Sequence, residues 1–242
     1  NYTFGGWYLN YTLSQTLNYE IMPLSNITLY AHWTEENKPT DFNYSGTTIN
    51  GYIGTSTTMW IPTYINDMPV STISSSAFTN NTSITTVVVP DTVKSIGNAA
   101  FKGCNSIEKI TLPFVGAKDG VEDYTSVFGY IFGYSRSSLS GWIDGSIVSS
   151  AKFINEKTGT APSGTIWQFS NVGSYDSYDH KIYSYYYYIP KTIKEVVITV
   201  DTTIPVAAFK ECSFIEKITL PETTTSIGTY AFQNCSGLKY LN

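Results

Sequence analysis

The chain of 242 residues has little of the side-chain chemistry on which enzymes depend. It contains two His and three Cys, and Asp, Glu, Lys and Arg together make up 14% of it. The sequence patterns of a phosphate-binding loop, a serine-hydrolase nucleophile elbow and an HExxH zinc site are all missing. We therefore expect no enzymatic activity, no metal and no cofactor.

The chain also lacks concentrated charge and long apolar runs. Its net charge is −5 and its Lys and Arg residues form no cluster, which argues against nucleic acid as a partner because phosphate backbones are bound by such clusters. No apolar run approaches the roughly 20 residues that span a bilayer, so we expect no membrane insertion. The N-terminus shows no secretion signal, and we interpret the chain as part of a longer protein.

Aromatic and β-branched residues are abundant instead. The sequence has 20 Tyr, 12 Phe and 5 Trp, together with many Thr, Ser and Val residues. Such residues favour strands, and no window of helical length is rich in Ala, Leu, Glu and Lys. We therefore predict a folded, mainly β protein.

One phrase of thirteen residues occurs four times. The copies align on an Ala-Phe pair at 72–84, 95–107, 203–215 and 226–238, and the two copies in each half start 23 residues apart. Each copy leads into a short apolar or alternating run, such as EKITLP after the second and third. A unit of this length, with one strand and one turn-rich return segment, lies within the range of leucine-rich-repeat solenoids. A stack of such units, here called rungs, is therefore predicted.

The position of each residue in the unit predicts its packing. In I-T-L the side chains alternate, so Ile110 and Leu112 should point into the core while Lys109 and Thr111 point out. One rung cannot bury its own apolar face, so its neighbours must cover it. Gly97 and Gly228 should stand where a Cβ would be crowded.

The three Cys recur at one position of the unit. Cys104, Cys212 and Cys235 each stand three residues after the repeated Phe, which favours a small buried packing role. A disulfide between Cys212 and Cys235 is an open alternative, because neighbouring rungs lie about 5 Å apart. Neither His recurs beside a Cys, so nucleophilic catalysis is not expected.

The pattern S-I-G-x-x-A-F-x-x-C-x-x-[IL], followed by x-x-I-x-L-P, resembles the BspA-type leucine-rich repeat of bacterial surface proteins. The resemblance covers about residues 41–116 and 189–242, and it departs from the family pattern at Ser74 and Pro205, where Gly is usual. It implies an extracellular or cell-surface location and a role in adhesion. The expected fold is thus a mainly β leucine-rich-repeat solenoid with rungs of about 23 residues, each of one strand plus a turn or short helix.

The N-terminal residues carry a second resemblance. The stretches YTFGGWYLN and IMPLSNITLYAHWTEE are similar to the second half of a Listeria-Bacteroides repeat, a small β-grasp-like module. We therefore interpret residues 1–35 as a truncated module of this kind and residues 36–41 as a linker to the solenoid at 42–116 and 189–242.

A long insertion, predicted at 117–188, interrupts the stack within one rung. Insertions in solenoids leave the stack on one face, which is often the binding face. Its tyrosines suit recognition because Tyr offers rigid amphipathic contact area. The alternative is a strand with one tyrosine face packed on the insertion. The candidate contact residues are Tyr175, Tyr178, Tyr183, Tyr185, Tyr186 and Tyr188.

The outer face of the strands is the other candidate surface. Lys109, Thr111, Lys217 and Thr219 should point out from it, although a merely solvated sheet would look the same. Asp176, Asp179 and His180, or Glu122 with Asp123, have no recognised metal-ligand spacing. A catalytic pair of Asp176 and Glu122 would need a geometry that the sequence does not supply.

The leading functional hypothesis is a non-enzymatic adhesion module of the cell surface. Its partner would be a host or extracellular protein or glycan of unknown identity, bound by a monomer through the rigid scaffold and its insertion. A structural spacer that holds another domain away from the cell is the alternative, and an enzyme is a third class.

Overall fold

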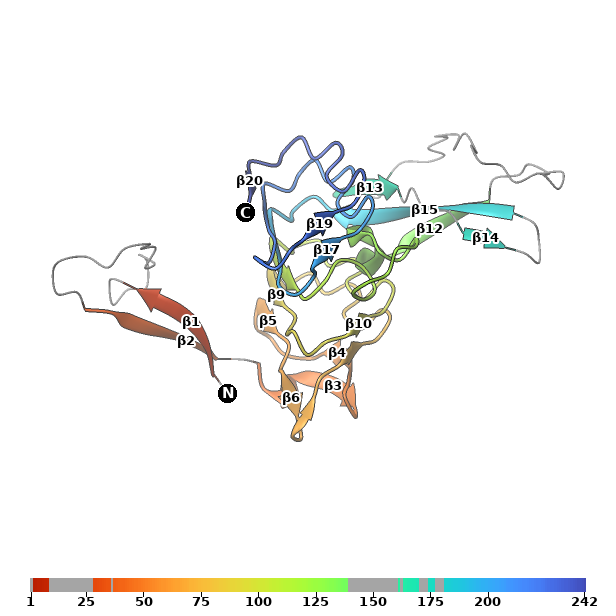
Figure 1. Ribbon diagram of the computed structural model, residues 1–242. Coiled ribbons are helices and arrows are strands. Elements are labelled where there is room, and N and C mark those ends of the chain that lie inside the picture. Colours follow the sequence, from red (N-terminus) through yellow and green to blue (C-terminus); the bar gives the residue numbers. More distant parts are fainter. Residues whose placement is uncertain are drawn as a thin grey trace.

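The computed structural model describes residues 2–8, 28–35, 37–138, 161, 163–169, 174–176 and 181–242. In these residues the elements are short strands and two 3-10 helices, and the strands of one repeat pair with those of the next (Figure 1). The predicted mainly β repeat solenoid is confirmed.

A six-stranded parallel sheet forms one side of the stack. Its in-register pairing places Met59, Val87, Ile110, Val196 and Ile218 side by side, with Leu241 at the end. The first five of these are 0% exposed, as the alternation in I-T-L predicts. In spatial order the strands are β5 (Thr58–Trp60), β9 (Thr86–Val88), β11 (Lys109–Leu112), β16 (Glu195–Ile198), β18 (Lys217–Thr219) and β20 (Tyr240–Leu241).

Shorter strands form a second side of the stack, in two separate sheets. Strand β4 (Thr48–Tyr52) pairs in parallel with β8 (Thr72–Ile73), which pairs with β10 (Ser95–Ile96). Strand β17 (Thr203–Ile204) pairs with β19 (Ser226–Ile227). The first rung is preceded by helix η1 (Pro39–Asp41), by β3 (Phe42–Ser45), which is antiparallel to β4, and by the hairpin of β6 (Tyr64–Ile65) and β7 (Met68–Pro69).

The return segments, which carry the Ala-Phe pairs, close the third side. The Phe101 N–H donates to the Ile131 carbonyl at 2.8 Å, and the Phe128 N–H donates to the Ala208 carbonyl at 2.8 Å. Helix η2 (Phe128–Phe132) therefore takes the place of an Ala-Phe return segment between the second and third copies of the repeat. Residues 127–133, although part of the predicted insertion, lie within the stack.

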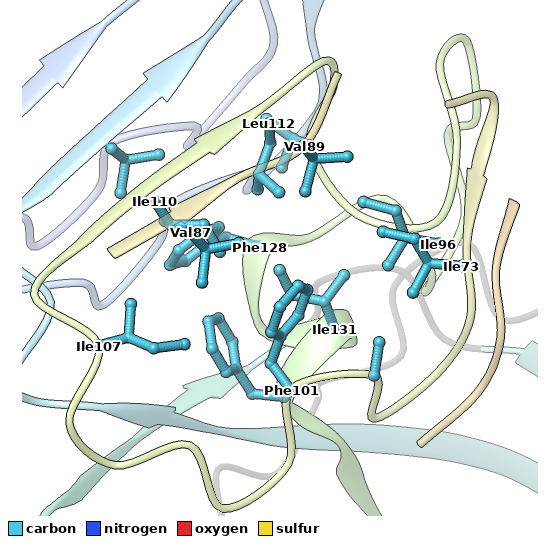
Figure 2. Packing of buried hydrophobic residues seen from close by; sticks show 14 of the residues in the cluster. Ile73, Val87, Val89, Ile96, Phe101, Ile107, Ile110, Leu112, Phe128 and Ile131 are labelled. Atoms are coloured by element: carbon cyan, nitrogen blue, oxygen red, sulfur yellow. The ribbon is translucent and has the colours of Figure 1, made fainter. Parts of the chain in front are cut away.

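A column of aromatic rings runs through all the return segments. Adjacent ring centroids are 5.0–6.3 Å apart, and η2 supplies two of the rings. Figure 2 shows Phe101, Phe128 and Ile131 pointing into the same core as Val87 and Ile110. The insertion therefore leaves the core continuous. In order, the rings are those of Phe78, Phe101, Phe132, Phe128, Phe209 and Phe232.

Gly97 and Gly228 allow neighbouring rungs to approach each other closely. A Cβ at Gly97 would lie 2.2 Å from the Ser75 nitrogen, and one at Gly228 would lie 2.5 Å from the Val206 nitrogen. The predicted crowding is confirmed. In both pairs of rungs it is the second rung that carries the Gly and packs over the first.

The cysteines have the packing role that their recurrence predicts. None of the three forms a disulfide. The Cys104 thiol donates to the Phe78 carbonyl and the Cys235 thiol to the Phe209 carbonyl, each at 3.0 Å. Burial raises the pKa of both thiols to about 11. They are therefore protonated packing groups at neutral pH and are not nucleophiles.

The N-terminal residues described are the antiparallel pair β1 (Tyr2–Tyr8) and β2 (Tyr30–Glu35). The predicted Listeria-Bacteroides module remains a prediction, and residues 9–27 lie outside the described part of the chain. In the predicted linker, Asn37 Oδ1 accepts the Trp60 N–H at 2.6 Å. This bond occupies a backbone donor of the edge strand β5, which would otherwise be open to another strand.

Candidate binding surfaces

The insertion contains a small antiparallel sheet built around one long strand. Strand β15 (Lys181–Pro190) pairs with β12 (Tyr134–Ser138), with β13 (Thr165–Phe169) and with β14 (Ser174–Asp176). Figure 1 shows β12, β14 and β15 extending away from the stack, beyond the side opposite to β5 and β9. The insertion thus presents strands clear of the repeats.

A buried amide holds this inserted sheet on the stack. Gln168 of β13 is 0% exposed. Its Oε1 accepts the Gly129 N–H at 2.6 Å, and its Nε2 donates to the Ala208 carbonyl at 2.9 Å. One side chain thus forms hydrogen bonds with buried backbone groups of both η2 and the next return segment.

Tyr187 makes the second connection. It is 0% exposed and packs with Val127 and Ala207, and its hydroxyl donates to the Tyr124 carbonyl. Gly129 makes this packing possible, because a Cβ there would lie 2.3 Å from the Tyr187 Cβ. The inserted sheet therefore has a fixed position relative to the repeats.

The opposite face of the inserted sheet carries an aromatic cluster. The Trp167 ring is 5.1 Å from the Tyr186 ring, nearly perpendicular to it, and 4.8 Å from the Tyr188 ring. All three side chains are half-buried, and burial raises the pKa of the Tyr186 phenol. Because side chains alternate along β15, burying Tyr187 turns Tyr186 and Tyr188 outward together.

The other predicted tyrosines differ in position. Tyr183 and Tyr185 lie on β15, with backbones in register with Ser138 and Arg136 of β12. Tyr175 lies on β14, in register with Ile182. Tyr178 is outside the described residues.

The outer face of the six-stranded sheet brings the four other predicted residues into two rows. Lys109 and Lys217 flank Glu195, at 3.2 Å and 3.3 Å. Burial alone would raise the pKa of Glu195, but the hydrogen bonds and charges of these two lysines bring it below its usual value. Thr111 and Thr219 flank Val197 in the next row. In this row of charges each cation is thus already paired within the sheet.

A parallel row of ion pairs crosses the start of the same strands. Glu216 lies 3.7 Å from Lys194 and 2.8 Å from Lys239. The sign of the charge alternates along this row and between it and the row of Lys109, Glu195 and Lys217. On this face Lys109, Lys194, Lys217 and Lys239 are each paired with a glutamate. A charged ligand would therefore have to break existing ion pairs in order to bind there.

Two groups that the sequence reasoning did not single out are buried polar residues, Gln168 and Asp201. Asp201 is 2% exposed and accepts the Val115 N–H at 2.7 Å. It stands three residues before the inward Ile204, where the other rungs have Val93 and Thr224. The sequence contains a signal for Asp201, because the repeat otherwise places Val or Thr at this position.

The other candidates for metal binding or catalysis are not brought together. Within the described residues, no group of three or more His, Cys, Asp or Glu could hold a metal ion. Asp176 is on β14, Glu122 lies exposed between β11 and η2, and both Asp179 and His180 are outside the described part. The same part of the chain contains no helix of the length and hydropathy needed to cross a membrane.

Comparison with protein families decides the class of the repeats. The model of the BspA type leucine rich repeat region matches six copies, over residues 64–119 and 180–242. These rungs are BspA-type leucine-rich repeats. No curated protein matches the chain.

Crystal structures of three leucine-rich-repeat proteins are similar to this chain. The T. pallidum leucine rich repeat protein is 17% identical, with 84% of this chain and 69% of that one covered and a TM-score of 0.39. A leucine rich cell surface protein of Faecalibacterium prausnitzii is 19% identical (80% and 49% covered, TM-score 0.32). A leucine-rich repeat protein of Bacteroides ovatus is 18% identical (83% and 51% covered, TM-score 0.31). The chain spans about half the length of the last two.

Proposed function

We propose that this protein is a non-enzymatic binding module of the cell surface, which recognises an extracellular protein or glycan through its inserted sheet. The observation that carries the proposal is the outward cluster of Trp167, Tyr186 and Tyr188, on a sheet that Gln168 and Tyr187 hold against the stack. Aromatic residues dominate binding energies when they are rigidly presented, because little conformational entropy is lost on contact.

Two further features support a module of this kind. BspA-type repeats form a scaffold whose rungs are dedicated to packing, which leaves recognition to the segments that depart from the repeat. The outer face of the six-stranded sheet has paired charges at Lys109 and Lys217, so it is the weaker candidate for a charged partner. The module is proposed to act as a monomer, which light scattering of the purified chain tests.

The test compares a triple variant, Trp167→Ala, Tyr186→Ala and Tyr188→Ala, with the unaltered chain. Both are applied to a glycan array and to a panel of immobilised extracellular-matrix proteins. Any probe that retains the unaltered chain should retain the variant at least tenfold more weakly, because each anchor residue contributes more than about 1 kcal/mol at a typical hot spot. Tyr240→Ala, on the exposed end strand of the other sheet, is the matched control.

Four results would contradict the proposal. Equal binding by the triple variant would exclude the aromatic cluster as the contact surface. Loss of binding in the Tyr240→Ala control alone would move the contact to the six-stranded sheet. Turnover of any glycan or peptide on the panels would show an enzyme, and binding to none of them would favour the spacer.

A further inference from the structure

The aromatic cluster of Trp167, Tyr186 and Tyr188 presents a small contact area. Fully exposed aromatic side chains offer about 150–250 Å² each, so three that are half-buried present at most about 400 Å² together. A specific protein interface buries about 800 Å² on each partner. The cluster by itself therefore has the size that suits a small ligand or one stretch of a polymer, and not a globular protein.

The strand segments that carry the cluster contain no charged residue. Residues 163–169 and 182–190 include no Asp, Glu, Lys or Arg. Arg136 of β12 is in register with Tyr185, which is a neighbour of the cluster and not a member of it. Burial raises the pKa of the Tyr186 phenol, so this group also stays uncharged at neutral pH. A charged ligand would lose hydration here without gaining an opposite charge from these segments, so the cluster favours an uncharged ligand.

The angles between the rings distinguish a flat surface from a single chain as the ligand. The Trp167 ring is inclined by 85° to the Tyr186 ring and by 52° to the Tyr188 ring. Rings with these inclinations cannot lie together on the flat face of an insoluble polymer. They can each contact one unit of a single chain whose successive units are rotated relative to one another.

Pyranose sugars have the size, the neutrality and the shape that this cluster favours. A pyranose has about the dimensions of a phenol ring, and its C–H groups form an apolar face that packs on an aromatic ring. Its hydroxyls stay at the edge of that contact, where they keep their hydrogen bonds. Tyr and Trp suit such amphipathic ligands because each combines an apolar ring with a polar group at its edge.

We propose that the aromatic cluster binds a neutral polysaccharide as a single soluble chain, with Trp167, Tyr186 and Tyr188 packed against the C–H faces of its pyranose units. This inference rests on the proposed function, because it names the ligand class of the same surface. Gln168 and Tyr187 hold the sheet beneath the rings in place, so little conformational freedom is lost when the chain binds.

Isothermal titration of the full chain with neutral polysaccharides, namely a xyloglucan, a mixed-linkage β-glucan and a galactomannan, tests the ligand class. We expect binding whose Kd changes by less than about twofold between about 50 and 500 mM NaCl, because no charge is there to be screened. Trp167→Ala and Tyr188→Ala should each weaken this binding at least about tenfold. Tyr64→Ala, which removes an exposed ring from the hairpin of β6 and β7, is the matched control and should leave the Kd unchanged.

Conservative variants test the contact without emptying the space that each ring fills. Tyr186→Phe and Tyr188→Phe keep the rings and should weaken binding less than the alanine variants do. The tryptophan fluorescence of the unaltered chain should change when the polysaccharide is added. Trp167→Phe should abolish this change and keep most of the affinity, because a ring still stands against the sugar.

The outcomes separate this inference from the proposed function. Binding of heparin, polygalacturonate or immobilised collagen that the alanine variants lose, with no binding of neutral chains, would overturn the ligand class and leave the proposed function standing. Retention on insoluble cellulose, with no binding of a soluble chain, would overturn the single-chain contact. Neutral chains that bind all variants equally would overturn both proposals, and so would binding of none of these probes.

Discussion

At the scale of the residue, the repeat requires two left-handed backbone positions in each of the four rungs that carry an Ala-Phe pair. One lies two residues before the repeated Phe and the other two residues after it, with φ between 56° and 76°. Only one of the eight residues is Gly, so most rungs adopt an unfavourable conformation that packing maintains. The residues are Ser76, Ala99, Ala207 and Tyr230 before the Phe, and Asn80, Gly103, Glu211 and Asn234 after it.

Tyr230 allows this strain to be measured, because its φ is 61° and its side chain is 54% exposed. We expect the free energy of unfolding of Tyr230→Gly to exceed that of Tyr230→Ala by about 0.5–1 kcal/mol. Both variants remove the ring, but only Gly adopts the left-handed backbone without strain. Urea unfolding of the two variants checks this. Equal midpoints would mean that the backbone at this position carries no strain.

At the scale of the element, η2 replaces an Ala-Phe return segment, and Gln168 compensates for the replacement. The helix places Phe128 and Phe132 in the aromatic column, and the Phe128 N–H donates to the Ala208 carbonyl, but the Gly129 N–H is bonded by the Gln168 side chain and not by a neighbouring rung. The Gln168 amide has an acceptor for this N–H and a donor that adds a second hydrogen bond to the Ala208 carbonyl. The inserted sheet is thus part of the stack on one face and exposed on the other.

Gln168→Met tests this compensation, since it keeps the length of the side chain and removes both bonding groups. Leaving the buried Gly129 N–H unsatisfied, and removing the second bond to the Ala208 carbonyl, should cost about 1–3 kcal/mol. We expect a lower thermal midpoint and faster hydrogen exchange in β13 and β15, with the six-stranded sheet less affected. Trp167→Phe, on the opposite face of the same strand, is the control, and equal destabilisation by both variants would refute the role of the amide.

At the scale of the whole molecule, the two halves of the solenoid are joined by β11 pairing with β16 and by the aromatic column. Phe128 lies in that column between Phe132 and Phe209, at 5.3 Å from each ring. Solenoids are stabilised by contacts between neighbouring rungs, so their cooperativity depends on the weakest junction. The junction from which the insertion emerges consists of the four-residue pairing of β11 with β16 and of the contacts of Phe128.

Phe128→Ala should therefore weaken the coupling between residues 42–127 and 194–242. A buried Phe→Ala change costs about 3–5 kcal/mol, and we expect the single unfolding transition to divide into two in calorimetry. Phe232→Ala, in the last rung of the described stack, is the control and should destabilise without dividing the transition. A single transition in Phe128→Ala would show that the β11–β16 pairing alone maintains cooperativity.

The regular part of the fold could be predicted from single residues. Val87 and Ile110 are inward because side chains alternate in a strand, and Cys104 is a packing group because it recurs with the rung. The sequence reasoning failed where a residue bonds outside its own rung. Residues 127–133 were expected in the insertion, yet η2 continues the stack, since its Phe residues fit the aromatic column at a spacing that the repeat pattern does not contain.

The sequence by itself determined the repeat, the solenoid and the family, because each of these depends on periodic side chains that pack against copies of themselves. Only the tertiary structure decided which residues hold the insertion and which face outward. Gln168, Tyr187 and Asp201 acquire their partners from segments some 40 to 90 residues away. Such contacts have no period, so they follow from the folded arrangement of the chain and not from any pattern along it.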